Sequence, residues 1–588
     1  MRDRLLVRHF LQRFLEHDLI SSTADRRDVV SVVGGALIAL TLFTSVLIAW
    51  VYQLNPFMPP GLTSVRSLDD RFLFVSVSML VMALLAVSQW DALSLDARDT
   101  AVLGILPIPK AAIIRAKFLA VALLAAGTLV ACNFAPTLFR FASVPTGLRI
   151  GVHASLILTM AHALVSLAAG VFGFLAVYGL REGLIAVLGQ NRFGSISSIL
   201  QSVLLVVLTS ALLLLPGSSI DVASRWFEGG RRVRQAVPQV WFVGLHETIA
   251  GRVIDDLPRT QPQRFLVVPE RNATNLYRSL RPLYRWLGRV ATEALAAVML
   301  ITIASCGWNS RRLPSAGIRR RRRSRALNLA ARWVVGHVVA RSPQREAGFW
   351  FTLQTLPRRL NHRVALASSL AVGFSLIVVT AGDRMLMVHT DAAIIPLTIL
   401  AAQALLITSV LTGFRHAAQV PSELRASRTF SLVWTADARS YVSGVKRAGF
   451  IALALPVLII LSLWHAALLP LRVAVLHLGV GTAYSIFLIE VLFLRYRRVP
   501  FVSAYQPGVE MKSHGVLYVV LMLLLSFALA GTERLAFQTV FRYVALIGAI
   551  GGLTVAAAAF DRARLEVPPM LDLEEQPASP TQRLGLFE

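Results

Sequence analysis

Residues 72–90 read FLFVSVSMLVMALLAVSQW, a stretch of 19 residues without a charged side chain. A helix rises 1.5 Å per residue, so this stretch is about 28 Å long, close to the roughly 30 Å thickness of a bilayer's hydrocarbon core. The whole chain of 588 residues is 55% hydrophobic and only 15% charged. The sequence therefore predicts an integral membrane protein and excludes an ordinary soluble globular class.

Eleven further stretches are apolar and long enough to cross a membrane as helices. The twelve predicted spans are Val29–Val51, Phe72–Trp90, Phe118–Leu138, Gly151–Tyr178, Ile196–Pro216, Val290–Cys306, Val364–Gly382, Ala392–Phe414, Ala448–Leu469, Val473–Leu494, Val516–Ala530 and Phe537–Phe560. We expect an all-α polytopic membrane protein.

The distribution of basic residues predicts the orientation of these spans. If both termini are cytoplasmic, the short outer loops are poor in Lys and Arg, as the positive-inside rule requires. The arginine run 319–323 then lies on the inner side, and the net charge of +27 reflects topology and not nucleic-acid binding. The arginine-rich loop 217–289 is the exception, but long loops are translocated largely regardless of charge.

The order of features repeats along the chain, which predicts two parallel six-helix halves in one membrane orientation. In each half, a basic amphipathic stretch precedes two spans, a charged inner segment follows, and four more spans come after it. The predicted regions are a cytoplasmic amphipathic elbow 1–28, a first membrane half 29–306 with outer loop 217–289, a basic cytoplasmic linker and second elbow 307–363, a second membrane half 364–560, and a disordered cytoplasmic tail 561–588.

The loop 217–289 contains PQVWFVGLHETIAGRVIDD at 238–256, which mixes aromatic, apolar and acidic residues. Such a composition favours an ordered external substructure over a disordered linker.

No pattern for catalysis is present. None of the four lysines follows a glycine, so the chain lacks the Gly-Lys pair of a P-loop. His246 and Glu247 begin like a zinc-protease helix, but Ala250 stands where the second histidine should be. Cys132 and Cys306 have no metal-ligand or disulfide spacing. We expect no enzyme activity, cofactor, metal or nucleic-acid partner.

Polar groups within spans are candidates for a transport pathway, because a charge deep in the bilayer costs at least about 2 to 3 kcal/mol. The candidates are Asn133, His153, His162, Glu293, Gln403, His465, His477 and Glu490, and Asn133, His162, Glu293 and Glu490 are the possible pathway residues among them. For Asn133 and His162, hydrogen bonding between helices is the competing interpretation. Glu293 and Glu490 lie near span ends, where a carboxylate can instead reach the interface.

The segment 96–118, DARDTAVLGILPIPKAAIIRAKF, separates the second and third spans. It contains the motif ILPIPK followed by IIRAK, and it resembles a segment in the permeases of the type-2 superfamily of ATP-binding-cassette (ABC) exporters. The elbow, the six spans per half and the external elaboration before the sixth span are also similar to that family.

The resemblance implies that the inner segment after each second span contacts a nucleotide-binding partner and transmits its ATP-driven closure. The implied contact residues are Asp99, Leu106, Pro107, Pro109, Lys110 and Arg115, with Arg425, Trp434, Asp437 and Arg439 in the second half. The second half has WTADAR at 434–439 where the first has LPIPK, so its role departs from the pattern.

The resemblance thus implies the transmembrane subunit of an ATP-driven exporter in a bacterial cytoplasmic membrane. One chain would bind two separate ATPase subunits and contact membrane lipids; neither its substrate nor, apart from the resemblance, its direction of transport follows from the residues. Two alternatives stay open. An ion-gradient-driven secondary transporter would need buried carboxylates or broken helices near the midplane. A polytopic membrane enzyme would carry its site in the outer loop, where Asp255 and Asp256 are adjacent acids.

Overall fold

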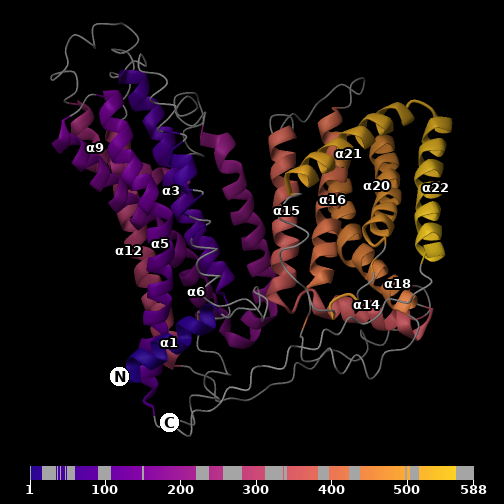
Figure 1. Cartoon of the computed structure of the whole chain (residues 1–588), viewed down its shortest axis with the longest axis horizontal. Coiled ribbons are helices and arrows are strands. Elements are labelled where there is room, and N and C mark those ends of the chain that lie inside the picture. The colour runs from indigo at the N-terminus through magenta and orange to yellow at the C-terminus, as the bar shows by residue number, and fades with distance from the viewer. Residues whose placement is uncertain are drawn as a thin grey trace. The chain divides into compact units, whose positions relative to one another are not determined.

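A computed structural model of the chain shows an all-helical protein, with no strand in the portion it describes (Figure 1). The described residues are 2–15, 35, 38, 39, 41–46, 48, 60–90, 108–148, 151–219, 237–255, 281–311, 336, 339, 341–381, 396–420, 422, 438–494, 496, 499–502 and 515–564.

Eleven helices within the described ranges are long and apolar enough to cross a membrane. They overlap eleven of the twelve predicted spans, which are confirmed as helices. The remaining prediction, Val29–Val51, lies largely outside the described residues. The chain divides into two compact units, Met1–Arg319 and Arg320–Glu588, and the division falls in the arginine run of the predicted linker.

The first unit is built from six described helices. They are α1 (Arg2–Leu15), α3 (Pro60–Ser88), α5 (Lys110–Leu148), α6 (Val152–Ser219), α9 (Pro238–Asp255) and α12 (Arg281–Arg311). Helix α6 contains the two predicted spans Gly151–Tyr178 and Ile196–Pro216. The helix is kinked between them at Gly189, whose φ of 75° is a left-handed conformation that favours glycine.

Helix α3 forms the centre of the first unit, where it packs against α5, α6 and α9. Its contact with α6 depends on small residues: a side chain at Gly173 would collide with the backbone carbonyl of Met79. In lipid there is little hydrophobic driving force for helices to associate, so van der Waals contact at such close approach stabilises the packing instead. Ser78 supports the contact by donating a hydrogen bond to the Ser166 carbonyl oxygen at 2.8 Å.

A buried ion pair fixes α9 to the end of the unit opposite α1 (Figure 1). The Arg71 guanidinium on α3 pairs with the Glu247 carboxylate on α9, and both side chains are 1% exposed. His246 Nδ1 lies 3.1 Å from Glu247 Oε1. The aromatic stretch of the predicted outer loop therefore forms an ordered helix over Pro238–Asp255.

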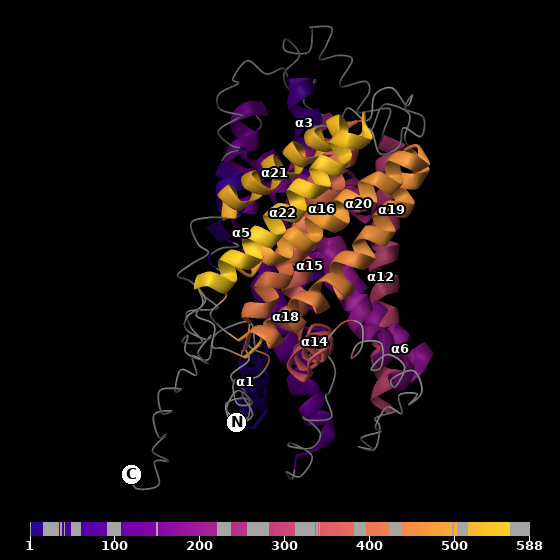
Figure 2. The ribbon, with the colours of Figure 1, turned by 90° about the vertical axis from the view of Figure 1, so that its right-hand side faces the viewer.

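The second unit contains nine described elements. They are α14 (Pro343–Thr355), α15 (Leu360–Ala381), α16 (Leu397–Gln419), α18 (Ala438–Gly449), the π-helical turn η4 (Phe450–Ala454), α19 (Leu455–Leu468), α20 (Leu471–Leu492), α21 (Gly515–Ala536) and α22 (Val540–Arg564). In Figure 2 the helices of this unit that are coloured orange to yellow face the viewer.

Helix α16 is the buried centre of the second unit and contacts α15, α19, α20 and α21. Its contact with α15 again uses small residues, because Gly373 lies against Ser409 and Gly413 lies against Ser369. In the described part of each unit, the second predicted span thus contacts several of the other helices. The predicted disordered tail lies beyond the described residues, apart from Asp561–Arg564, which end α22.

The ion pair that holds α9 can be tested by replacing one or both partners. Glu247→Gln leaves a buried guanidinium without an anion and should destabilise the protein by about 3–5 kcal/mol. Arg71→Leu combined with Glu247→Leu removes both charges and should recover most of that loss. Thermal unfolding in detergent measures both variants. Equal destabilisation by the single and the double replacement would contradict the assigned pairing.

Candidate functional site

The second unit has an amphipathic helix, α14, docked on the start of its third predicted span. Ser342 caps α14 by accepting a hydrogen bond from the Arg345 amide at 3.4 Å, and Pro343 supplies a first residue with a fixed backbone angle. The helix packs against α18 through two glycines that approach backbone directly. Gly348 lies against the Tyr441 carbonyl, and Gly444 lies against the Arg345 carbonyl.

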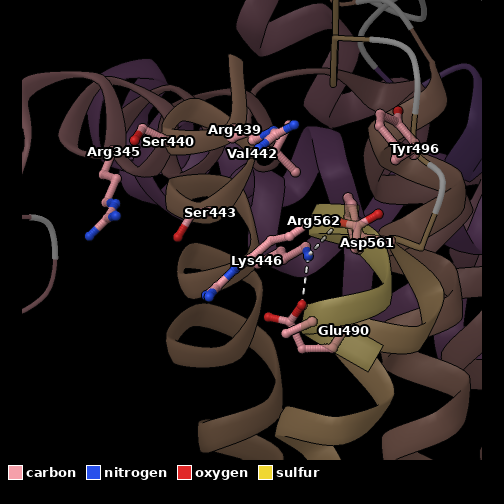
Figure 3. A pocket seen from close by; sticks show the side chains of 12 residues that line it. Arg345, Arg439, Ser440, Val442, Ser443, Lys446, Glu490, Tyr496, Asp561 and Arg562 are labelled. Carbon is pink, nitrogen blue, oxygen red and sulfur yellow. Dashed lines mark hydrogen bonds and ion pairs between the residues drawn. The ribbon is translucent and has the colours of Figure 1, made fainter. Parts of the chain in front are cut away.

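A cavity of about 210 Å³ opens beside this contact, at the same end of the unit (Figure 3). Residues from α14, α18, α20 and α22 line it. The charged lining residues are Arg345, Arg439, Lys446, Glu490, Asp561 and Arg562. Four formal positive charges therefore face two negative ones, and the cavity favours an anionic group or an acidic partner segment.

Lys446 joins three helices within this cavity. Its Nζ donates to Glu490 Oε2 on α20 at 2.7 Å and lies 4.0 Å from Asp561 Oδ2 on α22. Figure 3 shows the ammonium between the two carboxylates. The Lys446 side chain is 12% exposed, so this ion pair is screened less than one on an open surface.

The C-terminal end of α16, where the second predicted inner segment begins, is held in place at the same end of the second unit. Arg415 Nε donates to the Leu492 carbonyl at 2.8 Å, and its guanidinium lies 4.1 Å from the Tyr496 ring centre. Tyr496 donates its hydroxyl to the Ala418 carbonyl at 2.9 Å. The Phe501 amide also donates to this carbonyl, so α16 ends in a fixed position.

The first unit has a corresponding anchor at the exit of α3. Trp90 is fully buried, and its Nε1 donates to Ser197 Oγ at 2.8 Å. The Arg181 guanidinium lies 6.0 Å from the Trp90 ring and 5.8 Å from the Phe193 ring, within cation–π range. Arg181 also pairs with its neighbour Glu182, which accepts a hydrogen bond from Asn309 at 2.8 Å.

Helix α1 of the first unit packs against α5, as α14 of the second unit packs against α18. The Phe10 side chain of α1 is 1% exposed. Lys117 on α5 is buried, with its Nζ 5.5 Å from the Phe10 ring centre. Helices α1 and α14 therefore each contact the basic beginning of the helix that follows a predicted inner segment.

The predicted partner contacts divide into two groups. Six of them, Asp99, Leu106, Pro107, Arg425, Trp434 and Asp437, lie outside the described residues. The other four are placed: Pro109 and Arg115 are exposed, Lys110 begins α5, and Arg439 is exposed at the cavity.

The predicted pathway residues do not form one site. Asn133 donates to Ser78 Oγ at 2.9 Å, which is the interhelical hydrogen bond that the sequence left open as its alternative role. His162 is buried between Phe74 and His246, whose rings are 5.9 and 6.4 Å from its own. Glu293 is exposed on α12, and Glu490 lines the cavity.

Several charged residues inside the units were missed by sequence analysis. Arg71 and Arg181 lie just beyond predicted span ends, and Glu533 lies in the short connection before the last span. A charged residue directly beside an apolar run is the only signal that marks them. Among the residues that the structure describes, no group of three or more His, Cys, Asp and Glu side chains is placed to hold a metal ion.

Comparison of the chain with protein-family models, with curated proteins and with solved structures finds no match.

The contact that forms one wall of the cavity can be tested at Gly444. Gly444→Leu forces a side chain into the α14 backbone and should destabilise the protein by about 1–3 kcal/mol. Gly551→Leu on α22 is the matched control, because an added side-chain carbon there meets nothing within 4 Å. Thermal unfolding in detergent compares the two. A Gly444→Leu protein as stable as the control would show that α14 does not need this close approach.

Proposed function

We propose that the chain is the transmembrane subunit of an ATP-driven exporter of the ABC class and that it receives ATP-driven motion from separate ATPase subunits. One observation carries the proposal. In each unit an amphipathic helix packs across the basic start of the helix that follows an inner segment: α1 on α5, and α14 on α18. The resemblance around ILPIPK implies an amphipathic elbow in each half and an inner segment that contacts the ATPase, and these helix starts directly follow the predicted inner segments.

The packing around these surfaces supports force transmission. Trp90 and Arg181 hold the exit of α3, while Arg415 and Tyr496 hold the exit of α16. Motion applied to a segment between such anchored ends moves the packed spans as rigid bodies, because close-packed interiors transmit strain. The cavity with Arg439 and Lys446 would give a partner's acidic segment a place to bind.

The proposal treats the two units as parallel repeats with both termini on the inner side. The corresponding packing of α1 and α14, and the central positions of α3 and α16, support the repeat. One chain would then supply the whole pathway to two ATPase subunits, in contact with membrane lipids in a bacterial cytoplasmic membrane. The direction of transport rests on the resemblance alone.

Ion-gradient-driven transport is a second candidate, favoured by one observation. Glu247 and Glu533 are fully buried carboxylates, which sequence analysis named as the requirement of this class. Glu247 is neutralised by Arg71, so only Glu533 is suited to binding a coupling ion.

Charge reversal at the start of α5 tests the leading proposal. Lys110→Glu combined with Arg115→Glu should uncouple ATP hydrolysis from transport, because both residues belong to the proposed contact. Arg472→Glu, an exposed position at the opposite end of the second unit, is the matched control. The assay measures ATP hydrolysis and substrate movement in vesicles that contain the chain and its ATPase. Unchanged coupling in the double variant removes these residues from the mechanism. Transport on a proton gradient without ATP would favour the second candidate.

A further inference from the structure

The second unit contains a buried carboxylate whose only ion-pair partner among the described residues is a histidine. Glu533 Oε2 on α21 lies 3.0 Å from His477 Nδ1 on α20, and the two side chains are 2% and 1% exposed. We infer that His477 and Glu533 form an exchangeable proton-binding site. This inference goes beyond the proposed function and does not depend on the energy source for transport.

The charge balance of the pair requires this proton. A carboxylate beside a neutral imidazole carries a net charge of −1, and a buried charge without a partner is very unfavourable. One added proton makes the pair neutral, whether it resides on the carboxyl group or makes an imidazolium. In the first unit the charge of the buried Glu247 carboxylate is instead balanced by Arg71, which is always a cation.

No lysine or arginine side chain among the described residues forms an ion pair with Glu533. His465 on α19 is fully buried, with its ring 4.6 Å from that of His477. Gln403 on α16 donates to the His477 carbonyl at 2.9 Å, and Tyr543 on α22 donates to the Leu476 carbonyl at 3.2 Å. The nearby arginines, 534 on α21 and 542 on α22, have exposed side chains.

Exchange needs a group that passes the proton on, and the second ring nitrogen of His477 is that group. His477 Nε2 is buried without a hydrogen-bond partner among the described residues, while His465 Nε2 donates to the Ile399 carbonyl at 3.2 Å. When the Glu533 carboxyl group gives its proton to His477 Nδ1, the imidazolium can release the proton on Nε2 to water. The site is then a neutral His477 beside an ionised Glu533, and it binds a new proton in turn.

The pH dependence of folding tests the site, and its sign follows from proton linkage. In the unfolded chain, the carboxyl and imidazole groups are both deprotonated above about pH 6.5, whereas the folded site keeps one proton. Unfolding therefore releases a proton, and the folding equilibrium constant should fall as the pH rises above about 7, by about tenfold per pH unit for as long as the folded site keeps its proton. Glu533→Gln is neutral in both states and should remove this component.

Thermal unfolding of the full-length chain in detergent measures the difference between wild type and Glu533→Gln over that pH range. Glu490→Gln, which removes a half-buried carboxylate paired with Lys446, is the matched control and should keep the wild-type slope. Equal slopes in wild type and Glu533→Gln would overturn the inference.

Infrared spectroscopy gives a second readout that does not depend on how stable a variant is. At about pH 8 exposed carboxyl groups are ionised, so a protonated carboxyl band or an imidazolium band reports a proton held in the interior. We expect one of these bands in wild type and a changed band in His477→Asn. If wild type shows neither band, the site does not hold a proton.

Discussion

The structure depends on one constraint: a hydrocarbon layer contains no water, so every charge within it needs a partner from the protein. The described residues follow this constraint in two ways. Most charged groups lie near helix ends, where Arg439 and Lys446 line an open cavity. Several of those buried inside a unit are paired, as Arg71 is with Glu247 and His477 is with Glu533.

The same constraint explains why small residues hold the spans together. Lipid tails are as apolar as leucine, so helices gain little from excluding them and associate by close packing and hydrogen bonds. Gly173 allows α6 to approach α3, and Gly373 with Gly413 allows α15 to approach α16. The central helix of each unit is thus held by backbone proximity, while the amphipathic helices α1 and α14 cover the basic ends.

The sequence predicts the spans well because an uninterrupted apolar run is a local signal that tolerates small errors in its ends. It predicts the pairing of charged groups poorly, because partners such as Arg71 and Glu247 are 176 residues apart and their contact is a property of the fold. Averaging over a hydrophobic window also hides Glu533, which lies in a short connection between two spans. Asn133 was found because it interrupts an apolar run, although its hydrogen bond to Ser78 gives it a structural role.

Each unit contains a buried carboxylate, but the two carboxylates have different partners. This difference bears on function. Glu247 is paired with a guanidinium, whose charge does not depend on pH, whereas Glu533 is paired with an imidazole, whose charge does. The ends of the units that carry α1 and α14 instead resemble each other, and these are the ends where we propose that an ATPase partner binds. That assignment makes the chain incomplete without a second protein.

The composition of the assembly that the chain forms in its own cells decides whether it works with an ATPase. Native mass spectrometry of the chain, extracted gently from the cells that produce it, should show one copy bound to two copies of an ATP-hydrolysing subunit. A stable assembly that transports its substrate and contains no ATP-hydrolysing subunit would contradict the account.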